Sequence, residues 1–275
     1  MARDAKKRTL KVEGAVLYHE TRGEGPLLIL IPGGPSDADS LLSLAETLAN
    51  QFKVVTYDPR GNSRSRFDND PVDQDMNVHG DDAAALISEF DQGHALVFGN
   101  SGGAQIGLNL CARFPHLVRR LIAHEPPCIS LLPEFPQLLR AMNQIIETYH
   151  KLGSGPAMVQ FTQMAGIVVP ERTPQATTEP RSPSPFLKAN FSYFLEHGML
   201  PIARSQPDIE TLRQSQVIIG VGAKSEGQLA HRTGVALAKA LSQAPVIFPG
   251  DHSGWISNPV DFANVIASQL METQP

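Results

Sequence analysis

Short, wholly apolar segments alternate with longer amphipathic ones along most of this chain. Residues 27–31 form a continuous apolar run, as expected for a strand that is buried on both faces of a sheet. Residues 77–90 instead place apolar side chains three and four positions apart, which indicates an amphipathic helix. The pattern predicts strands at 9–12, 15–19, 27–31, 52–57, 95–98, 117–123, 216–221 and 245–248. Strands that alternate with helices predict an α/β protein with a mostly parallel, eight-stranded sheet and helices on both faces.

The alternation then stops, and the following stretch shows helical patterns without a good strand. The helices expected there are 136–152, 157–164 and 187–197. Prolines crowd residues 170–185 and predict a loop. We therefore expect residues 128–205 to form a helical lid, inserted into a core made of residues 1–127 and 206–275. A loosely packed connection is the alternative interpretation of this stretch.

Composition and charge exclude several classes of function. The 275 residues are 41% hydrophobic and 19% charged, with a net charge of −5, and apart from Lys6-Lys7-Arg8 they hold no basic cluster that would indicate a nucleic-acid partner. No apolar run is long enough to span a membrane. Two cysteines, Cys111 and Cys128, make neither a disulfide framework nor a zinc motif. Because no apolar run follows the charged N-terminal residues, we expect a cytoplasmic protein without a signal peptide.

The motif Gly99-Asn100-Ser101-Gly102-Gly103 lies between a predicted strand and a helical pattern. In this context Gly-x-Ser-x-Gly is typical of a nucleophile elbow, a turn in which the serine has strained backbone angles. Glycines on both sides of the serine let the strand and the helix approach closely enough for the turn. The N-terminus of the new helix then directs its N–H groups and positive dipole end toward negative charge that forms near Ser101. An ordinary glycine-rich turn is the alternative.

Four polar segments follow predicted strands at the edge of the sheet where open α/β proteins bind ligands. They are Pro32-Gly33-Gly34-Pro35, Asp58-Pro59-Arg60-Gly61-Asn62-Ser63-Arg64-Ser65, the serine motif, and Pro249-Gly250-Asp251-His252. In this order and spacing they make the chain resemble the α/β-hydrolase superfamily over its whole length. The resemblance implies the α/β-hydrolase fold and a site of serine, acid and histidine in that chain order. It also implies a structural role for Asp58 and Arg60.

Within this resemblance, Ser101 is the expected nucleophile and His252 is the base that takes its proton. The backbone N–H groups of Gly34 and Gly102 are the expected oxyanion hole. Relatives often have a histidine where this chain has Pro32, but that histidine is not part of the triad. The substitution therefore leaves the expected oxyanion hole unchanged.

The acid that orients the histidine has three candidates. The superfamily usually carries it after the penultimate strand, where this chain has Ser225 followed by Glu226. Some relatives, haloalkane dehalogenases among them, carry it one strand earlier, where this chain has Glu125 between a strand and two prolines. We expect Glu125 to accept the imidazole N–H, with Glu226 and then Asp251 as the alternatives.

A serine at the elbow favours attack on a carbonyl carbon, whereas the related epoxide hydrolases and haloalkane dehalogenases use an aspartate. We therefore expect a serine hydrolase that cleaves an ester-like bond, in a carboxylic ester, a lactone or a thioester, through an acyl-enzyme. Carbon–carbon bond hydrolysis, or other cofactor-free chemistry at the same site, is the first alternative, because Gly-Asn-Ser resembles the motif of such hydrolases. A non-catalytic ligand receptor that keeps the triad is the second.

The sequence shows no dinucleotide fingerprint and no metal-ligand cluster, so we expect no cofactor and no metal. The expected partner is a small-molecule substrate, and a homodimer is left open. Apolar residues of the expected lid favour an apolar acyl or aromatic group in that substrate, although the same residues can simply pack the lid on the core. They are Phe161, Met164, Phe186, Phe191, Phe194 and Met199.

Overall fold

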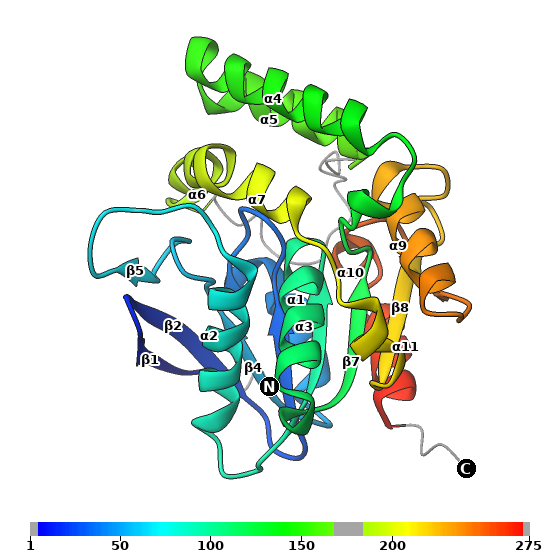
Figure 1. Ribbon diagram of the computed structural model, residues 1–275. Helices are drawn as coiled ribbons and strands as arrows, with labels where there is room; N and C mark the ends of the chain where they lie inside the picture. The colour runs from blue at the N-terminus through cyan, green and yellow to red at the C-terminus, as the bar shows by residue number, and fades with distance from the viewer. Residues whose placement is uncertain (1–4, 168–183, 272–275) are drawn as a thin grey trace.

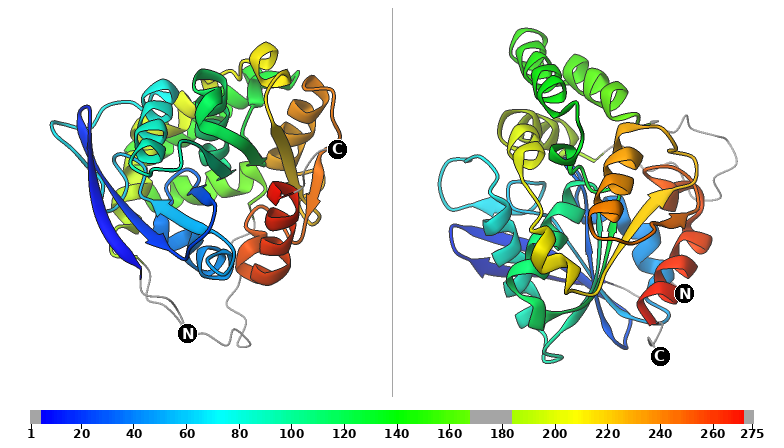
Figure 2. Two further views of the ribbon diagram at one scale, coloured as in Figure 1. Left: turned by 90° about the horizontal axis from the view of Figure 1, so that it is seen from below. Right: turned by 45° about the vertical axis from the view of Figure 1, so that its right-hand side comes forward.

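A twisted central sheet runs through the computed structural model, which describes residues 5–167 and 184–271 (Figures 1 and 2). Its strands follow the spatial order β1-β2-β4-β3-β6-β7-β8-β9. The pairs β1/β2 and β2/β4 are antiparallel, and all later neighbours in this order are parallel. The bounds are β1 Lys6–Val12, β2 Ala15–Arg22, β3 Leu27–Ile31, β4 Lys53–Tyr57, β6 Ala95–Asn100, β7 Val118–His124, β8 Val217–Gly222 and β9 Val246–Phe248. The α/β fold and the mostly parallel sheet predicted from the sequence are confirmed.

The sheet has one strand more than the eight that the pattern predicts. The two residues of β5, Arg66–Phe67, pair antiparallel with β2 at the end of the loop that follows β4. A strand of two residues is too short to show an alternation of apolar and polar positions. The ninth strand is therefore visible only through its backbone pairing.

Helices cover both faces of the sheet, as predicted. On one face lie α1 (Leu42–Leu48) and α11 (Pro259–Met271), with the short α10 (Gly254–Ser257) beside them. The opposite face is covered by α2 (Met76–Ser88), α3 (Gly102–Arg113) and α9 (Leu229–Ala240). The strands between them are almost wholly buried, which is why their sequences read as continuous apolar runs.

A helical segment connects β7 to β8. It contains α4 (Phe135–Leu152), α5 (Ser154–Ala165), α6 (Leu187–Tyr193) and α7 (Met199–Arg204), and the shorter α8 (Ile209–Arg213) precedes β8. No strand occurs in the described part of this segment. Figure 1 shows α4 and α5 as a helix pair above α6 and α7, beyond the carboxyl ends of the strands. The loop expected at residues 170–185 lies almost entirely outside the described residues.

Two of the helical stretches are broken into shorter pieces. The stretch between β3 and β4 begins as a 3-10 turn, Ala38–Leu41, because the Asp37 carboxylate accepts hydrogen bonds from the amides of Asp39 and Ser40. The helix expected at 187–197 ends at Tyr193 and continues as a π-helical turn, Phe194–Gly198. There the His197 carbonyl oxygen accepts a hydrogen bond from the Gln74 amide at 2.8 Å, because the residue four positions further on, Pro201, has no N–H to donate to it.

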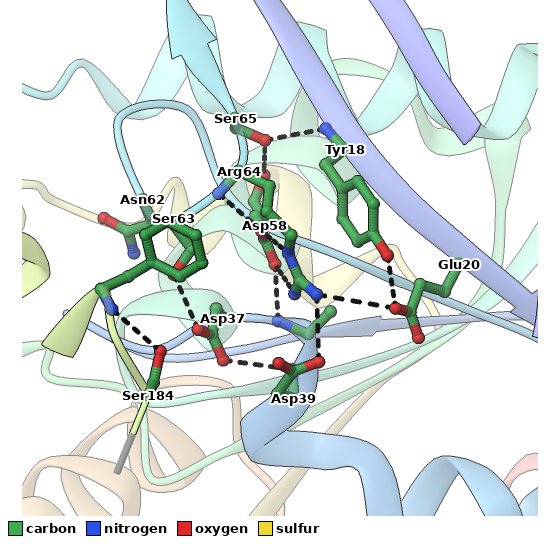
Figure 3. Close-up of polar contacts among 12 residues, drawn as sticks. Tyr18, Glu20, Asp37, Asp39, Asp58, Asn62, Ser63, Arg64, Ser65 and Ser184 are labelled. Carbon is green, nitrogen blue, oxygen red and sulfur yellow. Dashed lines mark hydrogen bonds and ion pairs between the residues drawn. The ribbon is translucent and has the colours of Figure 1, made fainter. Parts of the chain in front are cut away.

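Asp58, the first residue after β4, fastens the loop that leaves this strand. Its carboxylate is fully buried and accepts hydrogen bonds from the Ala38 amide (2.9 Å), the Arg64 amide (3.0 Å) and two nitrogens of the Arg64 guanidinium (2.7 and 2.8 Å) (Figure 3). Arg64 also forms ion pairs with Asp39 and Glu20. The structural role that the family resemblance implies for Asp58 thus has a physical basis in these contacts.

The same loop contacts the helical segment. The Ser63 amide donates to Asn190 Oδ1 at 2.8 Å, and Asn190 Nδ2 donates to the Ser63 hydroxyl at 2.9 Å. The Ser63 hydroxyl in turn donates to Asp37 Oδ2 at 2.7 Å (Figure 3). Asn190 is almost fully buried, so these bonds fix α6 against the core loops.

Replacing Asp58 by alanine should lower the free energy of unfolding by about 3 kcal/mol, because Arg64 loses a buried partner and two amides lose their acceptor. The control Asp68→Ala removes an exposed ion pair with Lys11 and should change the free energy by less than about 1 kcal/mol. Urea unfolding of both variants measures the difference. Small effects of equal size would show that Asp58 does not fasten the loop.

Candidate active site

Ser101 occupies a sharp turn between β6 and α3. It joins the last residue of the strand, Asn100, directly to the first residue of the helix, and its backbone angles are φ 54° and ψ −122°. The turn depends on two glycines: a Cβ at Gly99 would lie 2.4 Å from the Gly103 carbonyl oxygen, and a Cβ at Gly103 would lie 2.3 Å from the Ile31 carbonyl oxygen. The strained geometry expected of a nucleophile elbow is therefore present at this serine.

Glu125 is the candidate acid that the structure places against His252. It follows β7 directly, is fully buried, and its Oε2 lies 2.7 Å from His252 Nδ1. Its other oxygen, Oε1, accepts the Gly222 amide at 2.9 Å and the Ser225 hydroxyl. Both carboxylate oxygens thus have partners, as a buried charge requires.

These partners determine the protonation state of Glu125. Burial raises the pKa of its carboxyl, but the hydrogen bond to His252, the nearby imidazoles and the Ser225 hydroxyl outweigh that effect and lower the pKa to about 2. Glu125 is therefore a carboxylate throughout the neutral range. As a carboxylate it accepts a hydrogen bond from the Nδ1–H of His252. The other ring nitrogen, Nε2, is then the one available for reaction.

The two alternative acids lie elsewhere. Glu226 is exposed at the turn that precedes α9, and no hydrogen bond joins it to His252 among the described residues. The Asp251 carboxylate accepts the Ser253 amide at 2.9 Å and so caps the local turn. Ser225, noted in the sequence only because it stands where an aspartate is usual, instead donates its hydroxyl to Glu125.

Ser101 and His252 border one cavity of about 220 Å³, which lies under the helical segment. Both also border a smaller recess of about 50 Å³. Residues of α9 and Glu125 form part of its wall. The walls are mainly apolar. Of the lid residues expected to contact substrate, Phe161, Phe191, Phe194 and Met199 line the cavity, Phe161 and Met164 line the recess, and Phe186 lines neither. Trp255 also lines the cavity and donates its indole N–H to the Ser40 carbonyl oxygen at 3.1 Å.

The two glycines expected to form an oxyanion hole are neighbours in the cavity wall. A Cβ at Gly102 would lie 3.0 Å from the Gly34 amide nitrogen, so the two backbones approach closely beside Ser101. Gly34 has φ 43°, and Asn62 holds its turn by donating to the Gly34 carbonyl oxygen at 3.0 Å. Gly102 is the first residue of α3, where helical N–H groups lack intrahelical partners.

Metal chemistry has no candidate site in the described part of the chain, because no group of three His, Cys, Asp or Glu side chains there is placed to hold an ion. Cys111 and Cys128 are both buried and unbridged. None of the described helices combines the length and apolar character needed to cross a membrane.

With this geometry in view, comparison with known proteins assigns the class. The family model described as alpha/beta hydrolase fold matches residues 26–171, and the chain belongs to that family. An uncharacterized hydrolase, YraK of Bacillus subtilis, is 32% identical over 268 residues, 95% of each chain. A 2-(acetamidomethylene)succinate hydrolase of Mesorhizobium japonicum is 32% identical over 116 residues, 42% of this chain and 41% of that protein.

The solved structures support the same fold. A thermophilic esterase from Thermogutta terrifontis superposes with a TM-score of 0.71 at 17% identity, over 97% of this chain and 98% of the other. At that identity the likeness concerns the fold alone. Together, the family match and the relatives support a hydrolase of the α/β-hydrolase fold.

The pKa of Glu125 predicts how the stability of the protein depends on pH. A carboxyl whose pKa falls on folding, here from 4.5 to about 2, stabilises the fold fully above pH 4.5 and loses that contribution as the pH drops toward 2. Between pH 6 and pH 2.5, wild type should therefore lose about 3 kcal/mol relative to Glu125→Gln. Urea unfolding at a series of pH values measures the free energy of unfolding of both proteins, and the two values should approach each other as the pH falls.

Glu226→Gln, which changes an exposed carboxylate, is the control, and its curve should run parallel to that of wild type. If the curves of wild type and Glu125→Gln also run parallel, the carboxylate of Glu125 does not gain its stability from these hydrogen bonds.

Proposed function

We propose that the protein is a serine hydrolase that cleaves an ester-like bond, in a carboxylic ester, lactone or thioester, through an acyl-enzyme. The observation that carries this proposal is the 2.7 Å contact between the buried Glu125 carboxylate and His252, at the cavity that Ser101 also borders. The acid and the imidazole are hydrogen-bonded, and both line a recess that Ser101 also lines, which supports a role for these three groups in one reaction.

In the proposed mechanism, His252 acts as the general base. Because Glu125 holds Nδ1, the ring presents Nε2 as its acceptor and takes the proton of the Ser101 hydroxyl as the oxygen attacks the carbonyl carbon. The imidazolium that forms is stabilised by the adjacent carboxylate. His252 then returns the proton to the leaving atom as its bond to the carbonyl carbon breaks, and an acyl group stays on Ser101. The leaving group is an alcohol from an ester or lactone and a thiol from a thioester.

The carbonyl oxygen gains negative charge during the attack. The amides of Gly34 and Gly102 would donate hydrogen bonds to it, and each such donor is worth about 3 kcal/mol in the transition state. Water, activated by the same Nε2, then attacks the acyl-enzyme and releases the acid. Both half-reactions use the same groups, so the site needs no cofactor for this chemistry.

The helical segment, residues 128–205, is proposed as the lid of this site over a core of residues 1–127 and 206–275. Its helices α4, α5, α6 and α7 supply Met142, Met158, Phe161, Phe191 and Ile202 to the cavity wall. Among the described lining residues of cavity and recess there is no lysine or arginine, and Glu125 is the one carboxylate. We therefore propose a neutral, largely apolar substrate, since an unpaired charge in such a wall is costly.

Replacing Ser101 by alanine should reduce turnover of p-nitrophenyl butyrate by about a thousandfold or more, because the nucleophile is lost while the fold is kept. Steady-state release of p-nitrophenol measures the rate, and circular dichroism checks folding. Ser88→Ala, on α2, is the matched control and should keep the wild-type rate. Full activity in Ser101→Ala would refute the proposal.

The same assay separates the alternatives. Steady turnover of a lactone or a 1,3-diketone in place of simple esters would identify the preferred bond. Labelling of Ser101 by a fluorophosphonate without steady product release from any of these substrates would instead indicate a ligand receptor.

The apolar wall predicts charge discrimination. Phenyl butyrate should be hydrolysed with a kcat/KM about 100-fold higher than phenyl hydrogen succinate, whose carboxylate finds no cation. Thr162→Lys places an ammonium group at the cavity wall and should reduce this ratio at least tenfold. Gln163→Lys, on the exposed face of the same helix, should leave it unchanged. Equal rates for the two esters in wild type would contradict a neutral substrate.

A further inference from the structure

A second histidine lies beside the proposed triad and has no part in the mechanism above. His124 ends β7 directly before Glu125, and Asn100 ends β6 directly before Ser101. The two are register partners in the parallel sheet, and His124 Nδ1 lies 2.8 Å from Asn100 Oδ1. The backbones are joined at the same level, because the Ser101 amide donates to the His124 carbonyl oxygen at 2.9 Å. The strand that carries the serine is thus tied twice to the strand that carries the acid.

The direction of the side-chain bond follows from its atoms. An amide oxygen only accepts, so His124 Nδ1 must carry the proton. His124 is fully buried, which lowers the pKa of its ring to about 3 and keeps it neutral. With its single proton on Nδ1, the ring has one tautomer. Its Nε2 has no hydrogen-bond partner among the described residues.

The surroundings of the ring are those of a buried aromatic residue. The rings of Phe248 and Phe262 lie edge-on to it, with centroids at 5.1 and 5.3 Å. Phe98 follows at 6.2 Å, and Trp255 and His252 at 6.4 Å. A phenyl ring would suit this packing and would leave no nitrogen unpaired. What the imidazole adds at this position is the Nδ1–H that Asn100 accepts.

We infer that His124 is a positioning residue for the hydrolysis proposed above: its hydrogen bond to Asn100 fixes the peptide before Ser101 relative to the peptide before Glu125. The inference rests on the proposed function, because only a reaction that uses both residues depends on their separation. It extends that function, since His124 acts through Asn100 and the elbow and not on the substrate.

Two substitutions at this position separate the hydrogen bond from the packing. His124→Phe keeps a ring in the aromatic surroundings but removes the donor. Its kcat for p-nitrophenyl butyrate should fall 10- to 100-fold with KM changed less than threefold, because small displacements of reacting groups have effects of this size. His124→Asn places an amide nitrogen near the position of Nδ1 but leaves a hole in the packing. Compared with His124→Phe, His124→Asn should have the lower melting temperature but the higher kcat.

If His124 has only a structural role, the variant with the higher melting temperature should also have the higher kcat, so His124→Phe should be more active than His124→Asn. His79→Phe is the control, because His79 is also a buried histidine, on α2, but neither of its ring nitrogens has a hydrogen-bond partner among the described residues. Its replacement should leave kcat within twofold of wild type. A wild-type kcat in His124→Phe, or a more active Phe than Asn variant, would overturn the inference.

Nitrogen-15 NMR of the imidazole rings tests the bond without an activity assay. Wild type should show one histidine in the Nδ1–H tautomer whose shifts stay constant from pH 5 to 8 and whose signal is lost in His124→Asn. An Nε2–H tautomer at His124 would overturn the inference even if the variants failed to fold. Failure of the proposed function is recognised separately, by a wild type in which a fluorophosphonate does not label Ser101.

Discussion

The structure of the site depends on one constraint, the burial of a negative charge at Glu125. A carboxylate without water must be met by hydrogen-bond donors, and here they come from the Gly222 amide, the Ser225 hydroxyl and the His252 ring. These donors are 97, 100 and 127 residues away in sequence. The end of β7, the turn after β8 and the loop after β9 must therefore all be in place before the charge is satisfied. The site is therefore complete only in a chain whose sheet is complete.

The backbone is strained at two residues of the site, Ser101 after β6 and Glu125 after β7. Ser101 has φ 54° and Glu125 has φ 46°, conformations that cost a non-glycine residue about 1–3 kcal/mol. Each lies at the end of a central parallel strand, where the chain must turn abruptly to direct a side chain over the sheet edge. Hydrogen bonds to the neighbouring strands hold both turns, from Ser101 N to His124 O and from Glu125 N to Gly220 O, each at 2.9 Å. Strain and pairing across three adjacent strands thus fix the two side chains together.

Much of this could be predicted from the sequence, for physical reasons that also explain what could not. Parallel strands buried on both faces read as continuous apolar runs, so the positions of the main strands were predictable, and the elbow at Ser101 is a local motif. Glu125 was expected as the partner of His252 only through the family resemblance, with Glu226 and Asp251 as alternatives, because their contact joins residues 127 positions apart and spacing along the chain does not record it. The same holds for the two-residue β5, for the π-helical turn at Phe194–Gly198, and for the bond between His124 and Asn100. The role of Ser225 had a signal, its unusual place in the family pattern, but its meaning required coordinates.

Ser225 and Glu125 reach a common point from neighbouring strands, one with a short side chain and one with a long one. The electrostatic requirement of the imidazole concerns where the charge lies in space and not which strand supplies it. We therefore expect that an aspartate at 225 together with a serine at 125 would still place a carboxylate beside the imidazole, so that either strand can supply the charge.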